Sequence, residues 1–385
     1  MDSYRRTGAL IASLAVLSLA SACDKKDSKP PETGCTIVSG GVGTASGVPL
    51  PPACASAKPA GAVGGLHVLD WAGFKAAVSY TFDDGVDSQI ANYETLKAPG
   101  VPMTFYLNTR TATALTPEVR AAAFQRWLAD GNELGNHTAY HCHMSAAGAL
   151  EGDCAWSPGN VPVAGTTPQS EIAEVTSYIE DTLHQPGIWT MASPYGDADW
   201  DAFAAEAHFL VHRDVWQGML SPNDLTNQFH LPVYMVGAVQ YGGLSGDEAV
   251  IEQVAVDARD QGKWALILVH QVGPATDSIG CCEVPAATIA ASMRHLKALG
   301  NVWGDTVVNV ASYWVGQKLL STATPVVAGA TTTWSWELPA NFPPGKYLRV
   351  GVTGGTLKQH GTALPWNDRG FYEVALDAGE LTLEP

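Results

Sequence analysis

The sequence predicts an α/β fold in which a mostly parallel sheet curls into a barrel, followed by a small antiparallel β module. From residue 77 onward, apolar runs of strand length alternate with helical stretches, which is typical of βα units around a parallel sheet. Chemically active side chains follow directly after two of these runs, and the C-terminal strand ends of a barrel are where its site lies. From about residue 322 the pattern changes to short alternating segments separated by turns.

Apolar periodicity places the individual elements of the barrel. The expected strands are residues 77–82, 103–107, 188–192, 209–211, 265–269 and 307–310. The expected helices are residues 89–97, 117–130, 169–184, 247–261 and 286–299.

The C-terminal stretch is predicted to be an antiparallel β module because Pro-Gly and Gly-Gly turns separate its segments. These segments are residues 331–338, 347–352, 371–376 and 381–383. Trp334, Trp336 and Trp366 either stack on sugar rings or form the core of the module, and aromatic side chains in so small a module more often form its core.

Four side chains indicate a catalytic metal site. Asp83 and Asp84 end the first apolar run, where the chain breaks at a glycine, so one carboxylate can bind a metal while the other acts as a base. His137 and His141 are four residues apart, one helical turn, a spacing that lets both imidazoles reach one cation. Two imidazoles and one carboxylate leave coordination positions open for water and substrate. His143 is two residues from His141 and is expected to point elsewhere, on the surface or in a loop.

These residues resemble the motifs of the polysaccharide deacetylases, carbohydrate esterase family 4. The family's TFDDG motif is unchanged at residues 81–85, its H-[ST]-x-x-H motif fits 137–141, and its L-x-L-x-H motif fits 266–270. The R-x-P-Y-G motif is kept only in part, because Ala192 stands at the arginine position. The Asp-rich motif that ends in tryptophan is assigned to residues 212–216, and the resemblance covers roughly residues 63–320.

The resemblance implies a distorted (β/α)7 barrel and a metal-dependent hydrolase that removes acetyl groups, N-acetyl first of all, from a chitin-like or peptidoglycan polymer. The metal is expected to be Zn²⁺, with Co²⁺ or Ni²⁺ as alternatives. The implied roles are metal ligation by Asp84, His137 and His141, general base for Asp83, general acid for His270, an oxyanion donor in the backbone N–H of Tyr195, and substrate contacts from Pro194 and Trp216.

The missing arginine leaves Asp83 without the partner that orients it in the family. Arg213 ends the next predicted strand, and because strand ends gather on one face of a barrel, its guanidinium can reach the position left empty at Ala192. The alternative for Arg213 is a surface salt bridge with Asp214.

Two other functions stay open alongside the N-deacetylase. The same machinery serves an O-acetyl esterase on xylan-like chains, and the alanine at 192 is compatible with a glycan-binding protein that has lost catalysis. Retention of both the metal-binding and the proton-transfer residues favours an enzyme.

The N-terminal residues predict export. A basic pair, Arg5 and Arg6, precedes an uncharged apolar run that ends at Cys23. This pattern resembles a bacterial lipobox, with lipid attached at Cys23 as the only link to a membrane; an ordinary signal peptide cut near Ala22 is the alternative. The protein is therefore expected in the cell envelope, the periplasm or outside the cell. The predicted divisions are 1–23 signal segment, 24–62 flexible linker, 63–321 catalytic domain and 322–385 β module.

Composition supports an exported protein and argues against nucleic acid as a partner. Without residues 1–23 the chain has 37 acidic and 19 basic residues, so its net charge moves from −17 to −18 and repels phosphate backbones. Six cysteines remain after Cys23, an even number suited to disulfides. Proximity pairs Cys35 with Cys54 and Cys142 with Cys154, and leaves Cys281 and Cys282 as a vicinal pair.

Overall fold

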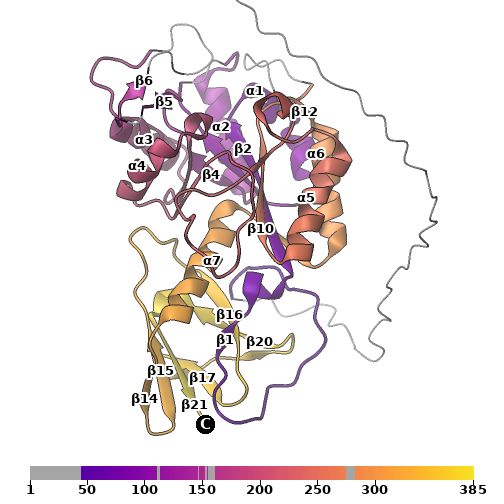
Figure 1. The fold of residues 1–385 in the computed structure, drawn as a ribbon, viewed down its shortest axis with the longest axis vertical. Coiled ribbons are helices and arrows are strands. Elements are labelled where there is room, and N and C mark those ends of the chain that lie inside the picture. Colours follow the sequence, from indigo (N-terminus) through magenta and orange to yellow (C-terminus); the bar gives the residue numbers. More distant parts are fainter. Residues whose placement is uncertain (1–44, 111–112, 146, 152–153, 155–160, 275–281) are drawn as a thin grey trace, which may run out of the picture. The chain divides into compact units, whose positions relative to one another are not determined.

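The computed structural model describes residues 45–110, 113–145, 147–151, 154, 161–274 and 282–385 (Figure 1). The predicted signal segment with Cys23, and residues 24–44 of the expected linker, lie outside these ranges. All described residues belong to one compact unit. Within the described ranges, no helix combines the length and the apolar character needed to cross a membrane.

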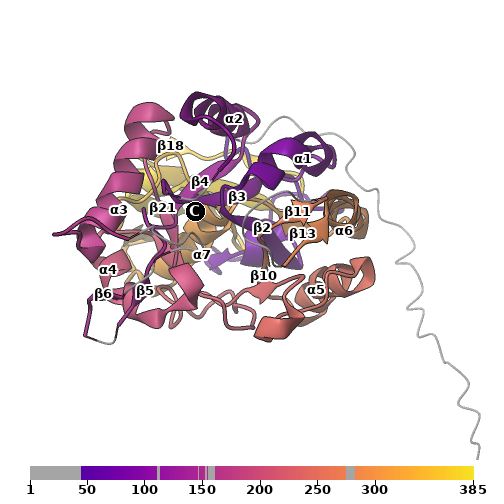
Figure 2. The same cartoon turned by 90° about the horizontal axis from the view of Figure 1, so that it is seen from above.

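A parallel sheet of eight strands forms the centre of the catalytic part (Figures 1 and 2). Its strands are β2 (Ala76–Asp84), β3 (Met103–Leu107), β4 (Glu133–Asn136), β7 (Thr190–Ala192), β8 (Val211–Arg213), β9 (Tyr234–Met235), β10 (Trp264–Val269) and β13 (Val302–Gly304). Seven of them follow one another in the order β8-β7-β4-β3-β2-β10-β9, and β13 pairs with β2. An isolated bridge between Arg213 and Leu231 connects β8 to the segment before β9. The curled, seven-stranded path confirms the predicted distorted barrel.

Helices surround this sheet (Figure 2). They are α1 (Asp87–Lys97), α2 (Pro117–Ala129), α3 (Pro168–Ser177), α4 (Asp201–Glu206), α5 (Glu248–Gln261), α6 (Ala286–Leu299) and α7 (Val307–Thr322). Local sequence sets their ends: Thr167 and Ser170 form a capping box at the start of α3, and Gly262 ends α5 in the left-handed conformation.

The strand predicted at residues 307–310 is wrong, because these residues form the first turn of α7. Thr306 caps this helix by accepting a hydrogen bond from the Asn309 N–H. The buried carboxylate of Glu133 accepts another from the Val308 N–H, at 2.9 Å. These two acceptors satisfy N–H groups that the first turn of a helix leaves unpaired, so the tertiary contact outweighs the strand preference of the valines.

The barrel core explains why the strand sequences are almost continuously apolar. All nine residues of β2 are buried, as are all six of β10, because parallel strands are covered on both faces. On β3, the Phe105 ring stacks on Phe82 and on Trp127 of α2, with centroids 4.9 and 3.9 Å away. Full burial of each such side chain contributes about 1.5–3 kcal/mol.

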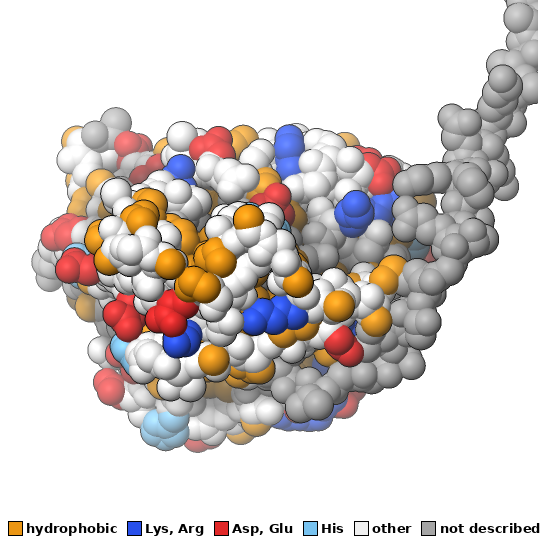
Figure 3. Space-filling view, turned by 90° about the horizontal axis from the view of Figure 1, so that it is seen from below, with side chains coloured by type: hydrophobic (Ala, Val, Ile, Leu, Met, Phe, Trp, Pro, Cys, Tyr) orange, Lys and Arg blue, Asp and Glu red, His pale blue; other side chains and the backbone are white. Residues whose placement is uncertain are grey.

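The predicted antiparallel module is confirmed and consists of two sheets. One contains β1 (His67–Val68), β16 (Tyr347–Gly351), β20 (Phe371–Ala375) and β19 (Trp366–Asn367); the other contains β14 (Val326–Ala328), β15 (Thr331–Ser335), β21 (Glu380–Glu384), β17 (Thr356–Gln359) and β18 (Thr362–Ala363). The Trp336 and Trp366 indoles donate to the carbonyls of Leu376 and Ser56, each at 2.8 Å, as internal packing residues do. On the face drawn in Figure 3, hydrophobic, acidic and basic side chains are interspersed.

The remaining strands form two short pairs, of which one is parallel and one antiparallel. They are β11 (Val272–Gly273) with β12 (Val284–Pro285), and β5 (His143–Met144) with β6 (Leu150–Glu151).

Residues 45–62 differ from the flexible linker expected of them, because the β module holds them. The guanidinium of Arg349 on β16 is buried and donates to the carbonyls of Val48, Pro49 and Ala72, at 2.7–3.0 Å. The Gly61 N–H donates to the Thr353 carbonyl at 3.0 Å. An extended Pro-rich segment makes no internal hydrogen bonds, so its carbonyls are available to such partners.

We expect Arg349→Met to lower the free energy of unfolding by about 3–5 kcal/mol, because three carbonyls and the Glu373 carboxylate lose a buried cation. Urea unfolding measures this. Lys358→Met breaks the more exposed pair with Glu384 and serves as the control, with an expected change below about 1 kcal/mol. Equal effects of the two substitutions would contradict the role of Arg349.

Candidate active site

The residues predicted to act together follow different strands but lie at one edge of the sheet. Asp83 and Asp84 end β2, His137 follows β4, Arg213 ends β8 and His270 follows β10. All four strand ends are C-terminal ends of parallel strands, which meet at the same edge of a barrel.

Asp84, His137 and His141 form a buried cluster whose ligand atoms lie within 4.8 Å of one another. Asp84 Oδ1 is 3.5 Å from His137 Nε2 and 3.7 Å from His141 Nε2. His137 Nδ1 hydrogen-bonds to the Ala192 carbonyl at 2.9 Å, so this nitrogen donates and leaves Nε2 as the ligand atom. The Asn108 amide donates to Asp84 Oδ1 at 3.1 Å. Two imidazoles and a carboxylate, with His137 and Asp84 oriented by hydrogen-bonded neighbours, fit a divalent transition-metal ion.

The two histidines converge for a different reason than the helical spacing suggested. Residues 137–141 are not helical; Thr138 and His141 have positive φ angles of 60° and 55°. The Thr138 N–H donates to the Asn136 side chain, which stabilises the sharp bend. The imidazole centroids are 4.7 Å apart. The helical-turn argument is therefore wrong about the backbone, although the side chains do meet.

Asp84 itself has a φ of 76°, and Gly85 follows at 59°. A Cβ on Gly85 would lie 2.7 Å from a methyl group of Leu107, so only glycine fits. This break gives the adjacent carboxylates different surroundings: Asp84 faces both histidines, whereas Asp83 faces Arg213 and, of the two histidines, His137 at 3.6 Å.

Arg213 lies beside Asp83 and not at the surface. It is fully buried, and its Nη2 is 2.5 Å from both oxygens of Asp83. Its Nη1 donates to the backbone carbonyl of Asp214 at 2.8 Å. Ala192 and Arg213 are register partners in the parallel pair β7–β8, so their side chains leave the sheet next to each other. This register explains how a guanidinium from β8 reaches the position next to Ala192.

Burial and charge together set the protonation of the site. Burial raises the pKa of Asp83, but Arg213, with smaller contributions from His137 and His270, holds it below its usual value. Burial lowers the pKa of His137 to about 4 and that of His141 well below 6.5, and it also lowers the pKa of His270. Near neutral pH the site therefore holds an ionised Asp83 and neutral imidazoles.

A cavity of about 320 Å³ opens above these groups. It is lined by Asp83, His137, His141, Ser193, Tyr195, Val215, Met235, Tyr241, His270 and Cys282. Pro194 and Trp216, predicted to contact substrate, are not among the lining residues. Pro194 is buried, and Trp216 stacks on His230 with centroids 5.5 Å apart.

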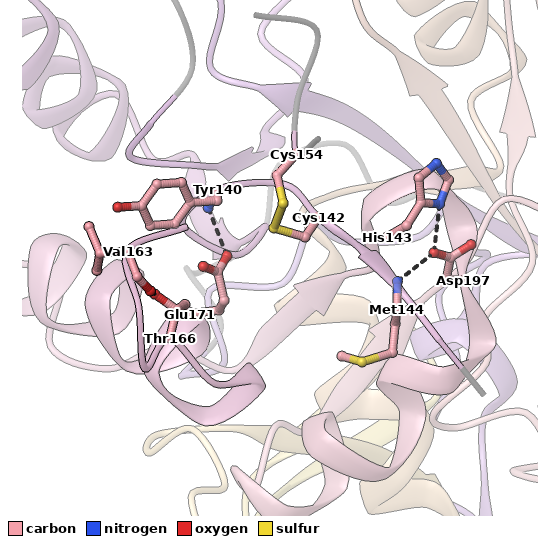
Figure 4. Close-up of a disulfide and its surroundings, with 9 residues drawn as sticks. All are labelled: Tyr140, Cys142, His143, Met144, Cys154, Val163, Thr166, Glu171 and Asp197. Atoms are coloured by element: carbon pink, nitrogen blue, oxygen red, sulfur yellow. Dashed lines mark hydrogen bonds and ion pairs between the residues drawn. A yellow bond between two sulfur atoms is a disulfide. The ribbon is translucent and has the colours of Figure 1, made fainter. Parts of the chain in front are cut away.

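Cys142, the residue after His141, is bonded to Cys154 in the only disulfide for which both partners are described (Figure 4). This pairing confirms the prediction, and both cysteines are fully buried. His143 lies outside the histidine cluster, as expected: its Nδ1 pairs with Asp197 at 3.0 Å, and its ring stacks on Tyr195 at 3.6 Å. Of the other predicted pairs, Cys35 and Cys281 lie outside the described residues, and Cys54 is disulfide-bonded.

Sequence reasoning missed two residues that support the site. Asn108 follows β3, and its position directly after a predicted strand was the available signal. Gln89 on α1 donates to the backbone carbonyls of Asp83 and His270, at 2.7 and 2.8 Å, which ties together the ends of β2 and β10. No spacing rule would have found this contact, because it joins residues 181 positions apart.

A parallel barrel that gathers two histidines and an aspartate beside a second, ion-paired aspartate has the arrangement of a catalytic metal site. Residues 73–210 match the family model for polysaccharide deacetylases. This part of the chain is a polysaccharide deacetylase domain, and the resemblance seen in its motifs is confirmed.

Solved structures with a similar fold include three proteins of this kind. A putative polysaccharide deacetylase from Mycobacterium smegmatis is 16% identical, with 66% of this chain and 94% of that chain covered and a TM-score of 0.44. Peptidoglycan deacetylase PdaC from Bacillus subtilis is 15% identical, with 61% of this chain and 89% of that chain covered and a TM-score of 0.36. BA3943, a CE4 family pseudoenzyme from Bacillus anthracis, is 14% identical, with 61% of this chain and 65% of that chain covered and a TM-score of 0.38. No curated protein matches the chain.

We expect His137 to make the metal-free protein less stable as the pH falls from about 6.5 to about 4, whereas Glu171, whose pKa burial raises to about 7, acts in the opposite direction. In this window the unfolded chain protonates His137 near its usual pKa of 6.5, whereas the folded protein keeps it neutral down to about 4. The unfolded state then binds more protons, so acid favours unfolding, by a few kcal/mol over a shift of this size. Asp83 contributes only below this window, because its pKa is lowered from 3.8.

Urea unfolding of chelator-treated protein at a series of pH values measures this effect. His137→Gln should show a smaller fall in unfolding free energy across the same window. An identical pH dependence in the two proteins would contradict the assignment of a buried, neutral His137.

Proposed function

We propose that this protein is an exported, metal-dependent hydrolase that removes acetyl groups from a chitin-like or peptidoglycan polymer. Its main substrate group is the N-acetyl group. The observation that carries the proposal is the convergence of Asp84, His137 and His141 with Asp83 and His270 at one cavity of a polysaccharide deacetylase domain. Attachment to a membrane, through lipid at Cys23, belongs to the same proposal.

Asp84, His137 and His141 would hold the ion, which is Zn²⁺ or alternatively Co²⁺ or Ni²⁺. When bound, such an ion supplies a Lewis acid for the acetyl carbonyl and lowers the pKa of a coordinated water. Asp83 takes a proton from the attacking water, and Arg213 keeps its carboxylate ionised and fixed in orientation. The backbone N–H of Tyr195 stabilises the oxyanion.

His270 completes the reaction by protonating the leaving nitrogen or oxygen. Burial lowers the pKa of His270, so the neutral imidazole takes up a proton during turnover before it donates one, and once protonated it is a strong proton donor. The reaction balances as one water consumed, with acetate and an amine, or a hydroxyl in the ester case, released. Binding without catalysis is disfavoured because the guanidinium missing at Ala192 is supplied by Arg213.

Acetate release tests the function. The purified protein is incubated with acetylated chitooligosaccharides, peptidoglycan and acetyl-xylan, after chelator treatment and after re-addition of Zn²⁺. We expect release from an N-acetylated substrate that chelation abolishes and Zn²⁺ restores. Release from acetyl-xylan alone would identify an O-acetyl esterase, and no release from any of them would leave glycan binding as the function.

The two adjacent carboxylates should separate metal binding from turnover. Asp83→Asn is expected to keep the metal and lower turnover by roughly 10²- to 10⁴-fold, because it removes the base. Asp84→Asn is expected to lose the metal, because it removes a ligand. Elemental analysis measures the metal content of both variants, and acetate release measures their turnover. Equal metal loss in both variants would refute the division of roles.

Arg213→Ala should lower kcat by about 10- to 100-fold, with KM and metal content little changed, because Asp83 loses the partner that orients it. Ala192→Arg in the same chain should restore part of kcat, since the two positions are register partners. Arg259→Ala, which breaks a surface pair with Asp260, is the control and should behave as wild type. An Arg213→Ala variant with full kcat would exclude the positioning role.

A further inference from the structure

A second group of metal-ligating side chains lies beside the catalytic cavity. Asp201 begins α4, Asp214 follows β8, and His230 lies in the loop between β8 and β9. One ligand atom from each residue lies within 4.8 Å of the others. Asp214 is 1% exposed, whereas Asp201 and His230 are about one-third exposed, so the group is anchored inside and reachable from solvent.

The contacts within this group are not ordinary hydrogen bonds. His230 Nδ1 is 2.5 Å from Asp214 Oδ2 and 3.2 Å from Asp201 Oδ2. Among the described residues, however, neither His230 Nδ1 nor Asp214 Oδ2 has a hydrogen-bond partner of acceptable geometry. A ring nitrogen has a single in-plane direction for its proton or lone pair, so it cannot serve two carboxylates at once. One nitrogen and two oxygens gathered in this way suit a cation, which on binding would move His230 Nδ1 and Asp214 Oδ2 to about 3 Å apart, the usual spacing of two ligands on one ion.

Each carboxylate is also held in the way that metal ligands are held. Ser193 Oγ donates to Asp214 Oδ1 at 3.1 Å, and His212 Nδ1 contacts Asp201 Oδ1 at 3.0 Å. In both cases one oxygen is engaged by the protein and the other faces His230 Nδ1. Neighbours that fix the orientation of ligating side chains are typical of metal sites, and Asn108 contacts Asp84 in the same manner.

We propose that Asp201, Asp214 and His230 form a second binding site for a divalent transition-metal ion, separate from the Asp84–His137–His141 cluster. One imidazole and two carboxylates suit Zn²⁺ or Mn²⁺, with water in the remaining positions. The ion neutralises two carboxylates that otherwise face each other, one of them buried.

The position of this site suggests what the ion does. Asp214 is the residue after Arg213, and its backbone carbonyl accepts from the Arg213 guanidinium. Trp216 stacks on the His230 ring. An ion at this site therefore fixes the segment that carries Arg213 and Trp216 relative to α4. This is a positioning role and does not depend on which acetylated substrate the enzyme uses.

Metal stoichiometry of the full exported protein tests the proposal without measuring activity. After exposure to Zn²⁺, or separately to Mn²⁺, and removal of free ion, elemental analysis should find two ions per wild-type chain. The double variant His137→Ala, His141→Ala should keep one ion. Adding His230→Gln to that variant should remove it, and adding Asp214→Asn should weaken its binding at least about tenfold, measured by titration calorimetry.

The control is His295→Gln in the same double variant, because His295 faces a single carboxylate, Glu252, at 3.6 Å. This variant should keep its ion. Melting temperatures and circular dichroism of each metal-free variant show whether it is folded. The proposal is overturned if the folded double variant binds neither ion, or if it binds one with an affinity that His230→Gln leaves unchanged.

Discussion

The buried ion pair between Arg213 and Asp83 is the interaction on which the rest of the site depends. Removing two charges from water costs several kcal/mol per ion, and this cost is offset only when the partners are close and well placed. Here one guanidinium nitrogen reaches both carboxylate oxygens, and the other nitrogen binds a backbone carbonyl. The pair joins the ends of β2 and β8, which lie four strands apart in the sheet order, so it also constrains the curvature of the barrel edge.

The second constraint is backbone strain at the same edge. Asp84, Thr138, His141 and Tyr195 all have positive φ angles, between 55° and 76°. Such angles cost a non-glycine residue about 1 kcal/mol or more and persist only where the surroundings impose them. Hydrogen bonds and a nearby disulfide supply that support: Asn136 holds the Thr138 N–H, Glu171 holds the Tyr140 N–H, and Cys142 is tied to Cys154. The stable barrel thus holds the two histidines and the aspartate in positions that an isolated loop would not adopt.

The β module is part of this support and not a loosely attached addition. β1, which precedes the barrel, pairs with β16 of the module, and Arg349 binds carbonyls on both sides of β1. Tyr313 on α7 donates to the Leu69 carbonyl, so the last barrel helix contacts the same segment. The chain before the barrel and the chain after it are therefore joined by backbone pairing.

The sequence by itself determined the alternation of strands and helices and the antiparallel module. It also identified the cluster of Asp84, His137 and His141, and the pairing of Cys142 with Cys154. Apolar periodicity, turn residues and short separations are local signals, and they are sufficient for these features. Strand ends gather on one face of a barrel, which is why Arg213, at the end of a predicted strand, was a candidate partner for Asp83. Tertiary structure alone decided the rest. Residues 307–310 became a helix because Glu133, far away in the sequence, binds its N-terminus. The histidines converge through a strained loop and not a helix turn, and Gln89 reaches the site from a helix whose sequence carries no catalytic pattern. These outcomes depend on contacts between residues distant in the chain, and their energies are absent from any local stretch of sequence.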